Sequence, residues 1–430
     1  VGALVAAAFG GCGRGIEEVV PAAQAPRLGG RVTFMHYRKA DEQPMIQQMV
    51  DAFVARHPDV TAEVVPQPDQ FYQKLQVLLA AGTPPDVFYA KPESYGFYVQ
   101  RGHLASLSPL IKRDRYDVTD FFPGSVSQYQ IRSQQYVLPR GYAPNTFYVN
   151  LELFKQEGVP LPAFAWKDTA WTWPRLVDVT RQLTKGEGDQ VTQHGLLPPT
   201  AFRGYASFIY SNGGELWDAQ GKECRITQPP TVEALQFIAD LIHKHRVAPT
   251  PADLKQMKAK ERWINRKAAL GQFSASRFGE WRRVGLDFDV AVPPKGAAPT
   301  RIVAGGGVGY ALAAEANARD LAWELLKWMN GKEMQLLEVQ LGNVFPPRRS
   351  IANSPAFLKP GEQPAHAALA VQAAERHVLV TPPFTRWDEL LAVMSEHLAT
   401  LWNGQESARS IAAKIKPPVD ALLRESPTPA

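Results

Sequence analysis

The sequence carries few of the residue patterns that perform catalysis. It contains no G-x-S-x-G, no Walker loop, no H-E-x-x-H and no C-x-x-C. His243 and His245 could suggest a metal, but residues two apart on a helix point to different faces, which favours solvated helix residues. The carboxylates of Asp287 and Asp289 stand where a polar segment enters a predicted strand and carry no distinguishing feature. We therefore expect no catalytic residues, no metal and no cofactor.

A glycine run, Gly305-Gly306-Gly307-Val308-Gly309, is the most unusual local pattern. It does not fit a dinucleotide fingerprint, because its spacing differs and it leads into the strand-like Tyr310-Ala311-Leu312 instead of a helix. Glycines let a backbone approach another group closely. Either a ligand or a packed neighbour would meet that requirement.

The bulk properties describe a folded protein with more than one core. The chain has 430 residues, of which 45% are apolar and 21% charged, and chains of this length usually form at least two domains. The net charge of +5 is spread along the chain, with no basic run interleaved with aromatic residues. We expect no nucleic-acid partner.

The first residues have the form of a lipoprotein signal. A short apolar stretch, residues 3–9, is followed by two glycines and Cys12, which would be the lipidated residue. A frayed apolar tail is the alternative. Residues 1–12 are thus expected to be the signal and residues 13–30, rich in Ala, Pro and Gly, a flexible spacer. No later segment has the roughly 20 apolar residues that span a bilayer, and Cys224 is expected to be a lone thiol.

The elements that must position a site alternate between strands and helices. Strand composition at residues 31–37, 60–65 and 86–89 alternates with helical spacing at residues 44–56 and 70–81. This order predicts a mostly parallel sheet with helices on both faces. A second series follows residue 150, with helices at 151–157, 172–183, 205–211 and 231–245 and strands at 268–273 and 289–292. Residues 387–423 are expected to form two amphipathic helices joined around residues 403–404. Open α/β sheets bind ligands at their strand ends, so two such units predict a shared cleft.

An ordered set of segments resembles the solute-binding proteins of carbohydrate importers, the group that includes maltose-binding protein. The resemblance covers roughly residues 31–425, and no single segment carries it alone. The segments are Pro58-Asp59-Val60, Tyr72-x-Lys74-Leu75, Thr83-Pro84-Pro85-Asp86-Val87, Tyr136-Val137-Leu138-Pro139, Phe147-Tyr148-Val149-Asn150, Trp171-Thr172-Trp173, Asn212-Gly213-Gly214-Glu215, Ala268-Ala269-Leu270, Ala322-Trp323-Glu324-Leu325 and Pro346-x-Arg348.

The resemblance implies an α/β, two-lobed periplasmic-binding-protein fold of type II, in which each lobe is a mostly parallel sheet flanked by helices. Lobe I would comprise residues 31–145 and 301–345, and lobe II residues 146–300 and 346–430. The ligand, a sugar or a similar solute, would bind in the cleft between the lobes. A monomer outside the cytoplasmic membrane would then present the closed lobes to the permease of an ABC importer.

Twelve residues match the ligand-lining segments of the family. Aromatic rings among them could stack on sugar faces, and planar polar groups could bind hydroxyls. For Trp173 the alternative is a staple of its own helix, and for Phe273 a place in the core. The candidates are Tyr37, Tyr72, Tyr89, Tyr142, Asn145, Trp173, Phe273, Arg277, Gly306, Gly307, Arg348 and Trp387.

The sequence leaves three alternatives open. Arg38, Arg140, Arg277 and Arg348 could together bind phosphate or carboxylate, because guanidinium groups match those anions, and the ligand would then be a glycerophosphodiester or another anionic solute. A glycan-processing enzyme would need two carboxylates facing each other across the cleft. The segments expected at the cleft supply few acids. A sensor in place of a permease as the partner is equally compatible with the sequence.

Overall fold

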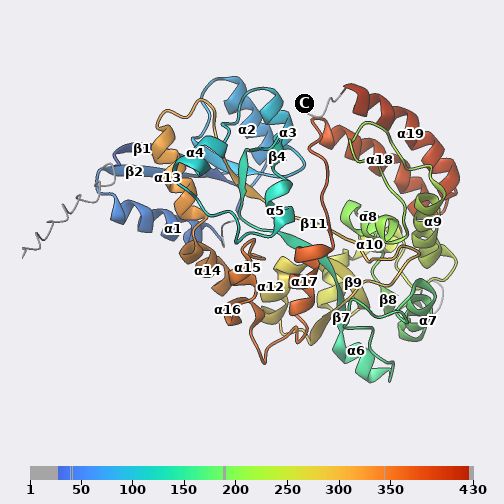
Figure 1. The fold of residues 1–430 in the computed structure, drawn as a ribbon. Coiled ribbons are helices and arrows are strands. Elements are labelled where there is room, and N and C mark those ends of the chain that lie inside the picture. Colours follow the sequence, from blue (N-terminus) through green and yellow to red (C-terminus); the bar gives the residue numbers. More distant parts are fainter. Residues whose placement is uncertain (1–27, 39, 41, 187–189, 343, 426–430) are drawn as a thin grey trace, which may run out of the picture.

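The computed structural model describes residues 28–38, 40, 42–186, 190–342 and 344–425. The predicted signal with Cys12, and most of the predicted spacer, lie outside the described residues. Within them, no helix is long and apolar enough to cross a membrane. Strands and helices alternate along most of the chain and build two main sheets (Figure 1), so the predicted α/β class is confirmed.

The first sheet has the order β2-β1-β3-β12-β6. Its strands are β1 (Gly30–His36), β2 (Val60–Pro66), β3 (Val87–Ala90), β6 (Val137–Pro139) and β12 (Gly309–Leu312). β1 runs parallel to both β2 and β3, whereas β12 runs antiparallel to β3 and β6. The helices of this half are α1 (Gln43–Arg56), α2 (Phe71–Ala80), α3 (Tyr95–Gln100), α4 (Ser108–Arg113) and α13 (Arg319–Met329).

The second sheet has the order β13-β11-β7-β9-β8, and β10 pairs with β7. Its strands are β7 (Ala143–Asn150), β8 (His194–Leu196), β9 (Ala268–Ser274), β10 (Phe288–Ala291), β11 (Val303–Gly306) and β13 (Val378–Leu379). The helices around it are α6 (Leu151–Gln156), α7 (Trp173–Leu183), α8 (Phe202–Ser211), α9 (Pro229–His243), α10 (Pro251–Gln256), α11 (Ala259–Ile264), α18 (Trp387–Trp402) and α19 (Ala408–Glu425).

The strand directions correct one detail of the prediction. Both sheets are mixed and not mostly parallel, because β7 runs antiparallel to β9, β10 and β11 and β12 runs antiparallel to both of its neighbours. The strands concerned are those that adjoin a connection between the sheets. A strand that enters from the other half of the molecule is not bound by the right-handed βαβ crossover that keeps successive strands parallel.

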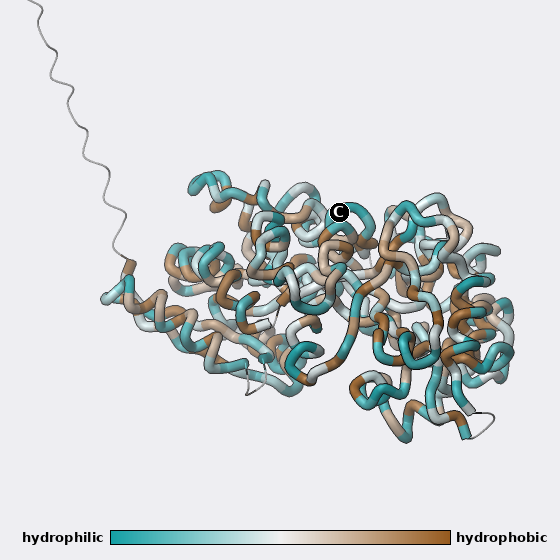
Figure 2. The backbone as a smooth tube through the Cα atoms, turned by 90° about the horizontal axis from the view of Figure 1, so that it is seen from below, coloured by the Kyte–Doolittle hydropathy of each residue, from teal (hydrophilic) through white to brown (hydrophobic). Residues whose placement is uncertain are grey.

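Each half of the molecule has its own apolar core. Phe34, Leu75 and Trp323 belong to the first, and Leu176, Ile238 and Trp387 to the second. A third cluster, around Phe345, joins α12 (Phe278–Arg283), α14 (Lys332–Gln340), α15 (Arg349–Ala352), α16 (Pro355–Leu358) and α17 (Ala368–Arg376) to the second sheet. α5 (Pro123–Ser127) packs against α17. Figure 2 shows apolar segments inside both halves of the molecule.

The chain passes between the two sheets at three places that lie together. Residues 140–142 lead from β6 to β7, residues 307–308 lead from β11 to β12, and residues 344–348 follow α14. The amides of Arg140 and Gly141 donate to the Val308 carbonyl at 2.9 and 3.1 Å, and the Tyr142 amide donates to the Phe345 carbonyl at 3.1 Å. These three connections lie near residues 145, 301 and 345, where the sequence predicts the lobe boundaries. The exact boundaries stay a prediction.

The glycine run is explained by this crossing. A Cβ on Gly307 would lie 1.9 Å from the Gly141 carbonyl oxygen, and one on Gly309 would lie 2.5 Å from the Leu138 carbonyl oxygen. Real Cβ atoms do not approach an oxygen so closely, so only glycine lets the two connecting segments pack backbone to backbone. The packed neighbour that the sequence left as one of two alternatives is therefore present.

We expect Gly307→Ala to lower the free energy of unfolding by about 3 kcal/mol or more, because the added methyl group must push two backbones apart. Chemical denaturation monitored by circular dichroism would measure the change. Gly29→Ala is the matched control, since a Cβ there meets Asp59 at an ordinary 3.5 Å. Equal stability of the two variants would contradict the backbone contact as described.

Candidate ligand cleft

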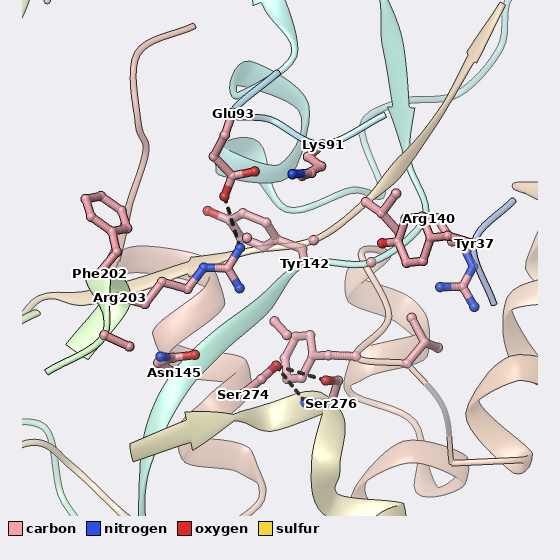
Figure 3. A pocket seen from close by; sticks show the side chains of 18 of the residues that line it. Tyr37, Lys91, Glu93, Arg140, Tyr142, Asn145, Phe202, Arg203, Ser274 and Ser276 are labelled. Carbon is pink, nitrogen blue, oxygen red and sulfur yellow. Dashed lines mark hydrogen bonds and ion pairs between the residues drawn. The ribbon is translucent and has the colours of Figure 1, made fainter. Parts of the chain in front are cut away.

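A cleft of about 590 Å³ lies where the two sheets meet. Its walls come from the ends of β1 and β3, from all three connections, and from β7, α8, β9 and α18 (Figure 3). The lining combines rings, hydroxyls, one amide and charged groups. Its polar and aromatic residues are Tyr37, Arg38, Lys91, Glu93, Arg140, Tyr142, Asn145, Phe202, Arg203, Ser274, Ser276, Phe345, Trp387 and Asp388.

The first wall is set by the carboxyl ends of two parallel strands. Tyr37 follows β1 directly, and Lys91 follows β3. The Tyr37 ring makes an edge contact with the buried Tyr89 ring at a centroid distance of 5.3 Å, and the Lys91 ammonium lies 4.0 Å from the Tyr72 ring centroid. Burial raises the pKa of Tyr37, so its hydroxyl stays neutral at physiological pH. This wall therefore presents a fixed ring and a hydroxyl.

The opposite wall is set by the start of α8 and the end of β9. Arg203 stands in the first turn of α8, and a Cβ on Gly306 would lie only 2.7 Å from its Nη2 atom. Gly306 also has a φ of +153°, so its lack of a side chain makes room for the Arg203 guanidinium. At the end of β9, the hydroxyls of Ser274 and Ser276 are hydrogen-bonded at 2.9 Å.

One ion pair joins the two walls. Arg203 Nη2 donates to Glu93 Oε1 at 3.2 Å, and the two residues come from opposite sides of the cleft (Figure 3). Their side chains are 32% and 14% exposed, so the pair is partly shielded from water. A shielded pair interacts more strongly than one on an open surface.

A second ion pair lies at the crossing of the connections, beside the cleft. Arg140 lies in the first connection, and its Nε donates to Glu338 Oε1 of α14 at 2.6 Å, with both side chains fully buried or nearly so. Burial raises the pKa of Glu338, and the Arg140 guanidinium opposes that shift. The pair neutralises a charge that would otherwise be buried at the crossing point.

The four arginines considered for an anion site do not gather at this cleft. Only Arg38 and Arg140 line it. Arg38 pairs with Glu42 at 2.8 Å and Arg140 with Glu338, while Arg277 pairs with Glu280 and Arg348 lies 3.6 Å from Asp120. Each guanidinium thus already has a carboxylate partner. Lys91 makes no ion pair with any residue that the structure describes.

Half of the predicted contact residues line the cleft. These six residues are Tyr37, Tyr142, Asn145, Gly306, Gly307 and Trp387. Tyr72 and Tyr89 stand one layer behind Tyr37, whose ring both of them contact. They can position that ring but do not line the cleft themselves.

The other four predicted residues lie elsewhere. Trp173 is buried in the second core and stacks on Phe237 of α9 at 4.4 Å, so it packs against another helix and does not only staple its own. Phe273 packs among Tyr148, Trp263 and Trp281. Arg277 hydrogen-bonds Glu280, and the Arg348 guanidinium lies 4.1 Å from the Phe121 ring centroid. The structure does not bring these four to the cleft.

Several lining residues were missed by the sequence analysis. Lys91 and Glu93 could have been found, because they follow the predicted buried strand that ends at residue 89, and strand ends in α/β units face the site. Phe202 and Arg203 carry no local signal, since they begin a helix after a Pro-rich loop. Asp388 follows the predicted Trp387 directly, at the start of α18.

His36 lies behind the cleft and is completely buried. Its Nδ1 accepts a hydrogen bond from the Arg38 amide at 3.1 Å, which requires an unprotonated nitrogen. Burial, together with the nearby Arg140 and Arg38 charges, lowers the pKa of His36 to about 4. The folded protein therefore holds this imidazole neutral well below the usual pKa of histidine.

We expect stability to fall as the pH drops from 6.5 to 4, because the unfolded chain binds a proton that folded His36 does not. The linkage slope is about 1.4 kcal/mol per pH unit for each such proton, and the contribution is fully present above pH 6.5. His36→Asn should show a shallower fall in unfolding free energy than the wild type over this interval. Urea titrations at each pH would measure it, and identical slopes would contradict the buried neutral state.

The chain is similar in sequence to known binding proteins. The sequence profile of the bacterial extracellular solute-binding proteins matches residues 39–336, more than half of the chain. The maltotriose-binding protein of Pyrococcus abyssi is 23% identical over 333 residues, which are 76% of this chain and 68% of that protein. The arabinooligosaccharide-binding protein of Halalkalibacterium halodurans is 23% identical over 199 residues, 46% of this chain and 42% of that protein.

Solved structures of binding proteins superpose on most of this chain. An ABC substrate-binding protein of Listeria monocytogenes, in complex with cycloalternan, superposes with a TM-score of 0.81 at 19% identity and covers 91% of this chain and 98% of its own. The GacH receptor of Streptomyces glaucescens has a TM-score of 0.77 at 19% identity, covering 93% and 99%. At these identities the likeness shows the fold, and it confirms the predicted two-lobed architecture.

Proposed function

The chain belongs to the family of bacterial extracellular solute-binding proteins, and we propose that it captures a neutral oligosaccharide for an ABC importer. The relatives named above are described as binding maltotriose and arabino-oligosaccharides, and one similar structure holds cycloalternan. The proposed partner is the membrane permease of that importer. We propose a monomer that acts outside the cytoplasmic membrane and performs no reaction on its ligand.

The lining of the cleft is the observation that carries this proposal. Tyr37, Tyr142 and Phe202 offer rings, and Asn145, Ser274 and Ser276 offer an amide and hydroxyls. Sugars need both kinds of contact, because their faces are apolar and their edges carry hydroxyl groups. The volume of about 590 Å³ falls within the usual range for small-molecule sites.

The pairing of the charges favours a neutral ligand. The arginines of the cleft each have a carboxylate partner, so an anion would have to compete with Glu42, Glu93 or Glu338. An anionic solute remains the second candidate on one observation, the Lys91 ammonium, which faces the cleft and contacts a ring instead of an acid. Hydrolysis is less favoured, since Glu93, one of the two lining acids, is held by Arg203.

A thermal-shift screen of the purified chain tests the ligand class. We expect a neutral oligosaccharide such as maltotriose to raise the melting temperature and to be recovered unchanged, with about 2.7 kcal/mol of added stability at a hundredfold excess over its Kd. Asn145→Ala should weaken binding about tenfold by removing a hydrogen bond. Asn317→Ala is the control, because Asn317 is exposed and does not line the cleft.

Two results of that screen would overturn parts of the proposal. A shift only with sugar phosphates or glycerophosphodiesters would make Lys91 the centre of an anion site. Release of smaller sugars during incubation would show an enzyme.

We also propose that the protein is anchored by lipid at Cys12. In cells that make lipoproteins, the wild-type chain should incorporate labelled fatty acid and sediment with membranes, and Cys12→Ala should do neither. Cys224→Ala is the matched control. That thiol is buried within the second lobe and its pKa is raised by burial to about 11, so it is a poor acceptor. Equal labelling of the wild type and Cys12→Ala would remove the anchor from the proposal.

A further inference from the structure

The ion pair between Glu93 and Arg203 differs from the other charged contacts of the cleft, because it spans the two walls. Glu93 lies between β3 and α3, on the side of the first sheet. Arg203 belongs to α8, which packs on β11 of the second sheet. The 3.2 Å contact between them therefore crosses the cleft (Figure 3).

Among the described residues, the other two ion pairs that include a lining residue do not join the walls of the cleft. Arg38 and Glu42 are four residues apart in the same segment. Arg140 lies in the connection between β6 and β7, and its partner Glu338 comes from α14, which packs against α13 on one side and against α15 and α16 on the other. If the halves rotate apart about their connections, Arg38 and Glu42 move together, and Arg140 and Glu338 stay at the crossing point. Glu93 and Arg203 must separate.

The position of Arg203 is fixed by more than its charge. Its guanidinium lies against the backbone of Gly306, where a Cβ would come within 2.7 Å, at the last residue before the chain crosses to the first sheet. The guanidinium is thus held at the end of the second sheet, beside the second connection. Hinge rotation of two lobes about a few connecting residues is a common route of closure around a ligand.

We propose that Glu93 and Arg203 form a latch across the cleft, which sets the fraction of molecules whose lobes are closed. Opening the latch exchanges one partly buried ion pair for two hydrated charged groups. Because dissolved salt screens the attraction between the two charges, the closed fraction should decrease as ionic strength rises. A bound solute would then leave only after the latch has opened.

The test measures the distance between the lobes without any sugar, so it can fail independently of the proposed ligand. Spin labels are placed at Gln100→Cys at the end of α3 and Ser395→Cys on α18, two exposed positions on opposite halves (Figure 1). The full chain carries Cys12→Ala, and Cys224 stays unlabelled because it is buried. Pulsed electron paramagnetic resonance then reports the closed and open populations.

We expect Glu93→Gln and Arg203→Gln each to lower the closed-to-open ratio about fivefold, and the double variant to lower it no further. Raising the salt to 1 M should open the wild type and leave the variants unchanged. Glu157→Gln is the matched control, since Glu157 pairs with Lys185 within the second half. Additive effects in the double variant would overturn the latch. An unchanged closed-to-open ratio in Arg203→Gln would also overturn it, even if Glu93→Gln failed to fold.

Discussion

The backbone contact between Gly141 and Gly307 is the constraint on which the rest of the molecule depends. Two segments cross from one sheet to the other within van der Waals distance, and the amides of Arg140 and Gly141 in the first segment donate to the carbonyl of Val308 in the second. Beside them, the buried pair of Arg140 and Glu338 stabilises the same point. Burying two charges costs free energy even when they are paired, so the pair is best understood as specifying the geometry of the crossing, with stability supplied by the apolar cores.

That crossing determines which residues can meet in the cleft. The carboxyl ends of β1 and β3 point toward it from one side, and α8 with the end of β9 from the other. Rings and hydroxyls are thereby placed around charges that are already compensated. A ligand that brings no charge of its own then leaves none of these pairs broken, which is the electrostatic reason for favouring a neutral solute.

Local pattern predicted the elements better than it predicted the site. The alternation of strands and helices placed β1, α1, β2, α2 and β3 correctly, because apolar periodicity is a property of each segment alone. It could not predict the antiparallel entry of β7 and β12, which depends on where a distant segment returns. Trp173 and Phe273 were predicted to bind ligand because their positions match the family's ligand-lining segments, whereas the structure uses both in packing. Glu93 and Arg203 are 110 residues apart, so no spacing rule could pair them.

The interleaving of the two halves has a consequence for synthesis. β12, at residues 309–312, lies in the interior of the first sheet between β3 and β6, and the last two helices, α18 and α19, complete the second core. Neither half can therefore finish folding while the ribosome is still making the first three hundred residues. A nascent chain of this topology lacks part of each core until late in synthesis, so its apolar surface stays exposed longer than in a chain whose domains fold one after the other. The topology that builds the cleft thus also delays folding until most of the chain has been made.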